Sequence, residues 1–128
     1  MNNKTKIRIR SDKELNLRKK GLFEIKKIFE EYNIPFFLWG GLLLGIKRDN
    51  NFIKWDWDVE LGLFSSDLKA NWKKIVRLLK ENDFEIIEKD LFNLKIEFIK
   101  YCKRDVTIYS LVGWRYDFFS GCYIRKKL

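Results

Sequence analysis

The segment from Phe36 to Leu63 constrains the fold more than any other part of the chain. An apolar run, PFFLW from Pro35 to Trp39, leads into it and favours a buried strand. A glycine pair then opens a short helix, GLLLGIKR, which ends at DNN, and the sequence DVELGLF favours another strand from Asp58 to Phe64. The segment therefore predicts two strands joined through a short helix that has a glycine pair at its mouth.

The rest of the chain predicts longer helices and further strands around this segment. A helix is expected from Ser11 or Asp12, both suitable N-caps, to about Tyr32, and a second long helix is expected after an SSD turn that starts at Ser65. The expected later strands are Phe84 to Ile87, Phe92 to Ile99 and Asp105 to Leu111, with a final hairpin of Trp114 to Phe119 and Cys122 to Ile124. This order predicts a single α+β domain over residues 1–128, with helices packed on a mixed sheet. Residues 1–10 alternate basic and apolar side chains and form either an edge strand or a basic arm.

Composition narrows the chemistry of the chain. Among its 128 residues there is no His, which excludes Ser/His/Asp and Cys/His nucleophilic sites, His-based zinc sites and phosphohistidine transfer. Catalysis would then depend on carboxylates, amines, hydroxyls and a hard metal ion. The 27 Lys and Arg residues exceed the 18 Asp and Glu residues and give a net charge of +9. This charge favours an anionic partner: a nucleotide, a nucleic acid, a phosphorylated glycan or an anionic membrane surface in peripheral contact.

Cysteine usage and hydropathy bear on the compartment. The two cysteines, Cys102 and Cys122, are too few to indicate a disulfide scaffold, so a reducing, cytoplasmic location is expected. No apolar stretch reaches the length of a membrane span, and the first residues lack the apolar core of a signal peptide. We therefore expect a chain without a transmembrane segment.

A carboxylate triplet suggests a metal site. Asp56, Asp58 and Glu60 stand at every second position, so in a strand their side chains project from one face. Three acids on one face repel one another unless a cation compensates their charge. Carboxylate oxygens are the ligands that Mg²⁺ prefers, and phosphates complete its coordination. On its own, such an alternation is also typical of a solvated outer face.

The glycine pair suggests a phosphate site beside these acids. Gly40 and Gly41 lack Cβ atoms, so phosphate oxygens can approach the backbone closely, and the N–H groups of the following helix favour an anion. A Gly-Gly pair is also common in an ordinary strand-to-helix turn. Arg48, near the end of that helix, either neutralises phosphate or keeps the helix end soluble.

These blocks resemble the LicD/fukutin-related group of the nucleotidyltransferase superfamily. The glycine-rich block matches at Gly40, Gly41, Leu43, Leu44, Gly45 and Arg48, and the acidic block at Ile53, Trp55, Asp56, Asp58, Val59 and Glu60. A third, weaker block is RDVTIYSL, where the family places a further Asp before an apolar strand.

The resemblance implies a nucleotidyltransferase-like fold and a metal-dependent reaction. It implies transfer of a phospho-group, of the phosphocholine or polyol phosphate type, from a CDP-linked donor to a glycan hydroxyl, with Mg²⁺ or Mn²⁺. Asp58 and Glu60 become paired metal ligands, Asp105 the third carboxylate, and Gly40 and Gly41 the phosphate loop.

Two alternatives stay open at this stage. For the third acid, Glu97 lies on a neighbouring predicted strand but alternates with apolar residues as a solvent-facing residue would, and Asp117 fits a hairpin. For the function, the alternative is a non-catalytic basic module that binds nucleic acid or another polyanion on the same fold.

Overall fold

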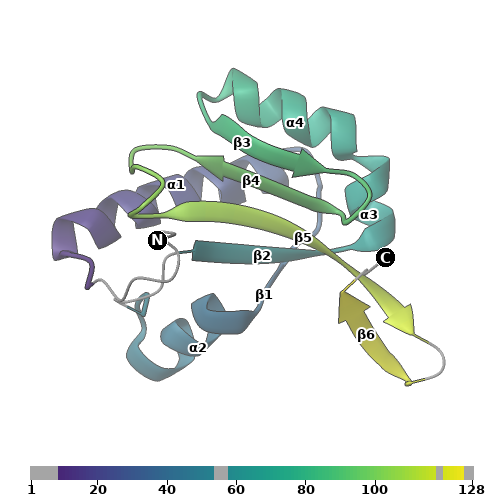
Figure 1. Ribbon diagram of the computed structural model, residues 1–128, viewed down its shortest axis with the longest axis horizontal. Helices are drawn as coiled ribbons and strands as arrows, with labels where there is room; N and C mark the ends of the chain where they lie inside the picture. Colours follow the sequence, from purple (N-terminus) through teal and green to yellow (C-terminus); the bar gives the residue numbers. More distant parts are fainter. Residues whose placement is uncertain (1–8, 54–57, 118–119, 126–128) are drawn as a thin grey trace.

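The structure of the protein is a computed structural model that describes residues 9–53, 58–117 and 120–125 (Figure 1). Its described strands form one six-stranded sheet of order β1-β2-β5-β4-β3, with β6 paired to β5. The strands are β1 (Phe37–Leu38), β2 (Asp58–Phe64), β3 (Glu85–Asp90), β4 (Lys95–Ile99), β5 (Ile108–Asp117) and β6 (Cys122–Arg125). Strands β2 and β5 run parallel, whereas the pairs β1–β2, β3–β4, β4–β5 and β5–β6 are antiparallel. The expected α+β fold with a mixed sheet is confirmed.

Four described helices accompany the sheet: α1 (Asp12–Glu31), α2 (Gly40–Asp49), α3 (Ser65–Ala70) and α4 (Trp72–Glu81). Helix α1 starts where the sequence predicts, because the Ser11 hydroxyl accepts the Glu14 backbone N–H while the Glu14 carboxylate accepts the Ser11 N–H. Within the described residues, none of the helices combines the length and the apolar character that crossing a bilayer requires.

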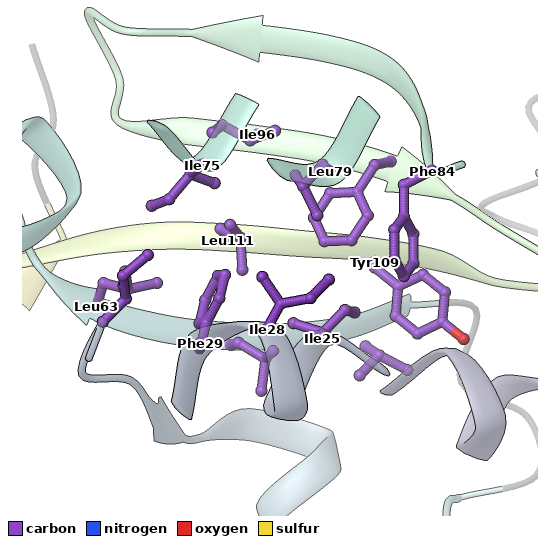
Figure 2. Close-up of a cluster of buried hydrophobic side chains, with 14 of the residues drawn as sticks. Ile25, Ile28, Phe29, Leu63, Ile75, Leu79, Phe84, Ile96, Tyr109 and Leu111 are labelled. Carbon is purple, nitrogen blue, oxygen red and sulfur yellow. The ribbon is translucent and has the colours of Figure 1, made fainter. Parts of the chain in front are cut away.

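The hydrophobic core lies between one face of the sheet and the helices α1, α3 and α4. Figure 2 shows side chains of α1 and α4 gathered against β2, β4 and β5: Ile25, Ile28, Phe29, Ile75, Leu79, Leu63, Ile96 and Leu111. Along β2, burial alternates, so that Val59, Leu61 and Leu63 face this core. The intervening residues of β2 therefore face the opposite side of the sheet.

The second long helix of the prediction is two helices in the structure. Asn71 leaves the helical region with φ −105° and ψ 9°, and its side-chain amide donates to the Asp67 carbonyl. The chain resumes as α4 at Trp72, with Ile75 N–H bonded to the Asn71 carbonyl. The expected SSD turn is also absent, because β2 passes directly into α3 at Ser65.

Strand β5 begins at Ile108, three residues later than the sequence predicts. The N–H groups of Val106 and Thr107 both bond to the Lys103 carbonyl, which makes this segment a turn. Two buried arginines hold the turn: Arg10 donates to the carbonyls of 105 and 106, and Arg18 donates to the Thr107 hydroxyl and the carbonyl of 106. Arg10 is thus a buried structural residue and not part of an exposed arm, while residues 1–8 lie outside the described residues.

Helix α1 approaches β5 closely at a glycine. A Cβ atom at Gly21 would overlap the hydroxyl of Tyr109, which donates to the Arg18 carbonyl at 2.6 Å. The absence of a side chain at this position therefore sets the distance between α1 and the sheet.

We predict that Gly21→Ala lowers the free energy of unfolding by about 1–3 kcal/mol, because the methyl group forces the helix away from Tyr109. Replacing a helical glycine with alanine normally stabilises a helix by about 1 kcal/mol. A fall in the free energy of unfolding would therefore point to the close contact with Tyr109. Urea denaturation measures the change, with Lys27→Ala on the exposed side of α1 as the control. Equal or higher stability of the Gly21→Ala protein would contradict this packing.

Candidate active site

Two carboxyl groups of β2 lie together on the sheet face opposite the core. Asp58 and Glu60 are half-buried and alternate with the core residues Val59 and Leu61. The two carboxyl groups lie close enough for Glu60 to raise the pKa of Asp58, both through a hydrogen bond and through its charge. The sequence expectation that these two acids share a face is therefore matched by their arrangement, whereas Asp56 lies outside the described residues.

Burial raises the pKa of Asp58 to about 7. The hydrogen bond to Glu60 and the repulsion from its charge act in the same direction, and the positive charge of Lys95 opposes them. Asp58 is thus poised to lose its proton near neutral pH, when a cation or a substrate arrives with compensating charge.

The sheet register extends this pair into a row of acids across four strands. Glu60 pairs with Ser110 of β5, Ser110 pairs with Glu97 of β4, and Glu97 pairs with Glu88 of β3. Directly paired residues share a face of the sheet. We call the residues Asp58, Glu60, Ser110, Glu97 and Glu88 the acidic row. Sequence analysis placed Glu97 on a solvent face, but its exposure is only 3%.

A signal for Glu97 is present in the sequence. The residue stands between two apolar residues in KIEFI, just as Glu60 stands between Val59 and Leu61. An acid between two apolar residues is ordinary on a half-exposed strand. Glu97 is buried because β4 lies inside the sheet, between β3 and β5.

Lys95 supplies a positive charge beside the acidic row. Its ammonium lies 3.9 Å from a carboxylate oxygen of Glu97, and its charge opposes the rise in the pKa of both Asp58 and Glu88. The hydrogen bond to Glu97 is the largest cause that raises the pKa of Glu88, so these two groups form a second carboxyl pair. Lys95 was not among the sequence-predicted site residues.

The amino end of α2 lies beside β2. Strand β1 pairs Leu38 with Leu61, and after Trp39 the chain enters α2 at Gly40, next to the acidic part of β2. Gly40 has φ +63°, a left-handed conformation that favours glycine, and apart from its chain neighbours and its own helix backbone no described atom lies within 4 Å of the position a Cβ would take. The helix therefore opens at the glycine pair, as expected, with open space in front of Gly40.

Arg48 and Asp105 stand outside the strands that carry the acidic row. Arg48 is exposed in the last turn of α2, at the opposite end from Gly40 and about 12 Å along the helix axis, on a rise of about 1.5 Å per residue. Asp105 is exposed in the turn that precedes β5, whereas Ile108 is the residue that pairs with Asp58. The register therefore brings Glu97, and not Asp105, into the acidic row; a catalytic role for Asp105 stays a prediction.

The described residues fit a divalent cation in part. Asp58 and Glu60 offer only oxygen ligands in mutual contact, and Mg²⁺ is usually held by one or two carboxylates with waters and substrate phosphates. Within the described residues, no group of three or more Asp, Glu or Cys side chains converges enough to hold a metal ion without further ligands. This donor set suits an ion that arrives with a phosphate ligand of its own.

We predict that Asp58→Asn changes the pH dependence of stability. An Asp with a raised pKa in the folded state binds a proton more tightly there, so wild-type stability falls between about pH 4 and 7 as pH rises. The amide cannot titrate, so above pH 7 the variant gains about 1–2 kcal/mol relative to the wild type, a figure reduced for partial exposure. Urea unfolding in EDTA measures this gain, and Glu31→Gln on the surface of α1 is the control. If Asp58→Asn were less stable than the wild type at pH 8, the inference that Asp58 and Glu60 destabilise each other would be wrong.

Comparisons with known proteins bear on the family and the fold of the chain. Residues 33–120 match the family described as LicD/FKTN/FKRP, nucleotidyltransferase domain. Among solved structures, the chain is similar to the lincosamide antibiotic adenylyltransferase LnuA bound to lincomycin, with TM-score 0.56 and 15% identity over 91% of this chain and 63% of that chain. This likeness concerns the fold alone and spans less than two thirds of the neighbour. A search of proteins of curated function gives no match. Because the family match covers most of its length, the chain belongs to the LicD/FKTN/FKRP family of nucleotidyltransferase domains.

Proposed function

We propose that this protein transfers a phospho-group, of the phosphocholine or polyol phosphate type, from a CDP-linked donor to a glycan hydroxyl with the help of Mg²⁺ or Mn²⁺. The observation that carries the proposal is the pair of carboxyl groups, Asp58 and Glu60, on one face of β2 beside the amino end of α2. Membership of a nucleotidyltransferase family supports a nucleotide-type substrate. The experiments test three parts of this proposal: the nucleotide base of the donor, the transferred group and the acceptor.

Each described group has a role in this reaction. Asp58 and Glu60 would hold the cation, which when bound neutralises phosphate charge and lowers the pKa of the acceptor hydroxyl. The backbone N–H groups at the start of α2 would bind oxygens of the donor pyrophosphate, because a helix amino end attracts anions. Lys95 would contact the transferring group as its charge develops.

A base is needed to take the proton of the acceptor hydroxyl. With no His in the chain, a carboxylate would take this proton. Glu97 is favoured because the register places it one strand beyond Ser110, which adjoins Glu60. Asp105 is the alternative that family resemblance implies.

We predict that Glu97→Gln lowers kcat by about a hundredfold or more and leaves donor binding nearly unchanged, because it removes a group used during transfer. Asp105→Asn is the matched comparison, since it makes the same chemical change three residues before β5. Release of CMP from CDP-choline or a CDP-polyol, with Mg²⁺ and a panel of glycan acceptors, measures turnover. If Asp105→Asn lost most of its turnover and Glu97→Gln kept normal turnover, Asp105 and not Glu97 would be the base.

Binding of the donor can be tested without an acceptor. Thermal unfolding is followed with CTP, CDP-choline, CDP-polyols and other nucleotides, each with and without Mg²⁺ or Mn²⁺, because a ligand of the native state raises Tm. We expect a metal-dependent shift for a cytidine nucleotide, lost in Asp58→Asn. Binding of polyanions without metal, and no nucleotide shift, would favour the non-catalytic module instead. The acidic row argues against such a module, because its four acids would repel the phosphate backbone of a nucleic acid.

We predict that Gly41→Val weakens nucleotide binding about tenfold or more while the protein stays folded, because the branched side chain occupies space that a phosphate needs. Calorimetric titration with the Mg²⁺ complex of the best nucleotide measures the loss. Leu44→Val, at an exposed position of the same helix, is the control for the change in helix propensity. If a folded Gly41→Val protein bound the nucleotide with normal affinity, the glycine pair would have no role in phosphate binding and would only form a turn.

A further inference from the structure

A groove of about 560 Å³ lies between helix α4 and β3, which is an edge strand among the described strands. Figure 1 shows α4 lying along β3, with the β3–β4 turn at the end of the sheet where α4 begins. Lys89 of β3 lines the groove, whereas its neighbour Glu88 belongs to the acidic row. Successive residues of a strand point to opposite faces, so the groove and the acidic row lie on opposite faces of the sheet.

Positive charge dominates the walls of this groove. Four cationic side chains line it: Lys73, Arg77 and Lys80 of α4, and Lys89 of β3. The three on α4 are three or four residues apart and therefore share one side of the helix. Lys89 faces them, because its strand partner Ile96 packs in the core that α4 covers (Figure 2). Glu81 is the one carboxylate among the described lining residues, and its ion pair with Arg77 is exposed.

Two large apolar side chains project from the turn at the end of the groove. Leu91 is 53% exposed and Phe92 is 67% exposed. The turn itself is held in place, because the Asp90 carboxylate accepts hydrogen bonds from the backbone N–H and the side-chain amide of Asn93, and Leu94 is fully buried. The exposure of both apolar residues is therefore a property of the folded turn, and adjacent exposed apolar side chains are typical of an interaction site.

An apolar tip beside a cationic groove fits the surface of an anionic membrane. Leu91 cannot stack on a base or form a hydrogen bond with a nucleic acid, but the acyl boundary of a bilayer accommodates it. Lysine and arginine side chains have long stems that reach lipid phosphates. Trp72, half-buried in the groove, belongs to the residue type that is enriched at membrane interfaces. The combination therefore favours lipid over nucleic acid.

We propose that this surface docks the protein on an anionic membrane. The docking surface consists of the apolar pair Leu91 and Phe92 and the four groove cations. The apolar pair enters the headgroup region while the cations contact lipid phosphates. Because the acidic row lies on the opposite face of the sheet, docking leaves Asp58 and Glu60 accessible. With two apolar side chains and four cations, the contact is peripheral and reversible.

Sedimentation of the full chain with lipid vesicles tests the proposal. The vesicles contain phosphatidylcholine alone, or phosphatidylcholine and phosphatidylglycerol in equal parts. We expect the protein to sediment with the anionic vesicles, to stay in solution with the neutral ones, and to be released by added salt, because salt screens exposed charges. No binding to anionic vesicles, or equal binding to both kinds, would overturn the proposal.

The apolar tip is tested by Leu91→Ser combined with Phe92→Ser. We expect this variant to bind anionic vesicles about tenfold or more weakly, because the apolar area that enters the membrane is lost. Phe23→Ser is the matched control, since Phe23 is 56% exposed on α1. An equal loss in the control would overturn the proposal. Unchanged vesicle binding in the turn variant would also overturn it and would leave a polyanion surface of the kind that binds RNA.

The groove cations are tested by Lys73→Gln combined with Lys80→Gln. This variant should bind anionic vesicles about tenfold or more weakly, because each cation near an anionic surface contributes to binding. The control, Lys13→Gln with Lys27→Gln, removes the same charge from exposed positions of α1. Equal losses in the two variants would show that binding follows net charge and not this groove, which would overturn the proposal.

Membrane docking and the proposed function can be separated in the same assays. Docking needs neither nucleotide nor metal, so vesicle binding should persist in Asp58→Asn. Loss of vesicle binding in Asp58→Asn would place the lipid contact at the acidic row and overturn the docking surface. Vesicle binding without any metal-dependent nucleotide binding would remove the transferase function and keep the docking surface.

Discussion

The parallel pairing of β2 with β5 is the constraint on which the rest of the structure depends. It fixes which residues of β5 stand beside which acids of β2, since each of the seven residues of β2 has a partner in β5. It also gives both strands one face against α1, α3 and α4 and one face for polar groups. Because side chains alternate in a strand, the core and the acidic row are specified by the same register.

The acidic row is held at an energetic cost that the core has to offset. Packing of β2 on one side, through Val59, Leu61 and Leu63, keeps Asp58 and Glu60 in place on the other. Carboxyl groups that are forced together raise each other's affinity for a proton or a metal ion. Strain of this kind is common at functional sites, where binding of the ligand relieves it.

Much of this arrangement could be predicted from sequence because it depends on local patterns. The bounds of β2 follow from its alternation, the start of α1 from Ser11 and Glu14, and the opening of α2 from the glycine pair. The family resemblance is carried by residues that are close in sequence, and the family match confirms it. The fold class follows from the order of these elements.

What sequence could not supply depends on contacts between distant segments. The burial of Glu97 requires that β4 pair with β5, which no pattern within KIEFI indicates. The late start of β5 requires carbonyl contacts from Arg10 and Arg18, about ninety residues earlier in the chain. The break at Asn71 has a local cause, a side-chain amide that bonds the backbone, but Asn is also tolerated inside helices.

The central place of β5 has a consequence for the way the chain acquires its structure. Both β2 and β4 pair with β5, so before β5 is synthesised β2 has only the short strand β1 beside it and β4 has only β3. The contacts that Arg10 and Tyr109 make span 96 and 91 residues, and such distant contacts slow folding. On the ribosome, the edges of β2 and β4 that pair with β5 would therefore stay unpaired until β5 has emerged. The domain should form late and all at once, with its acidic row assembled in the same step as its core.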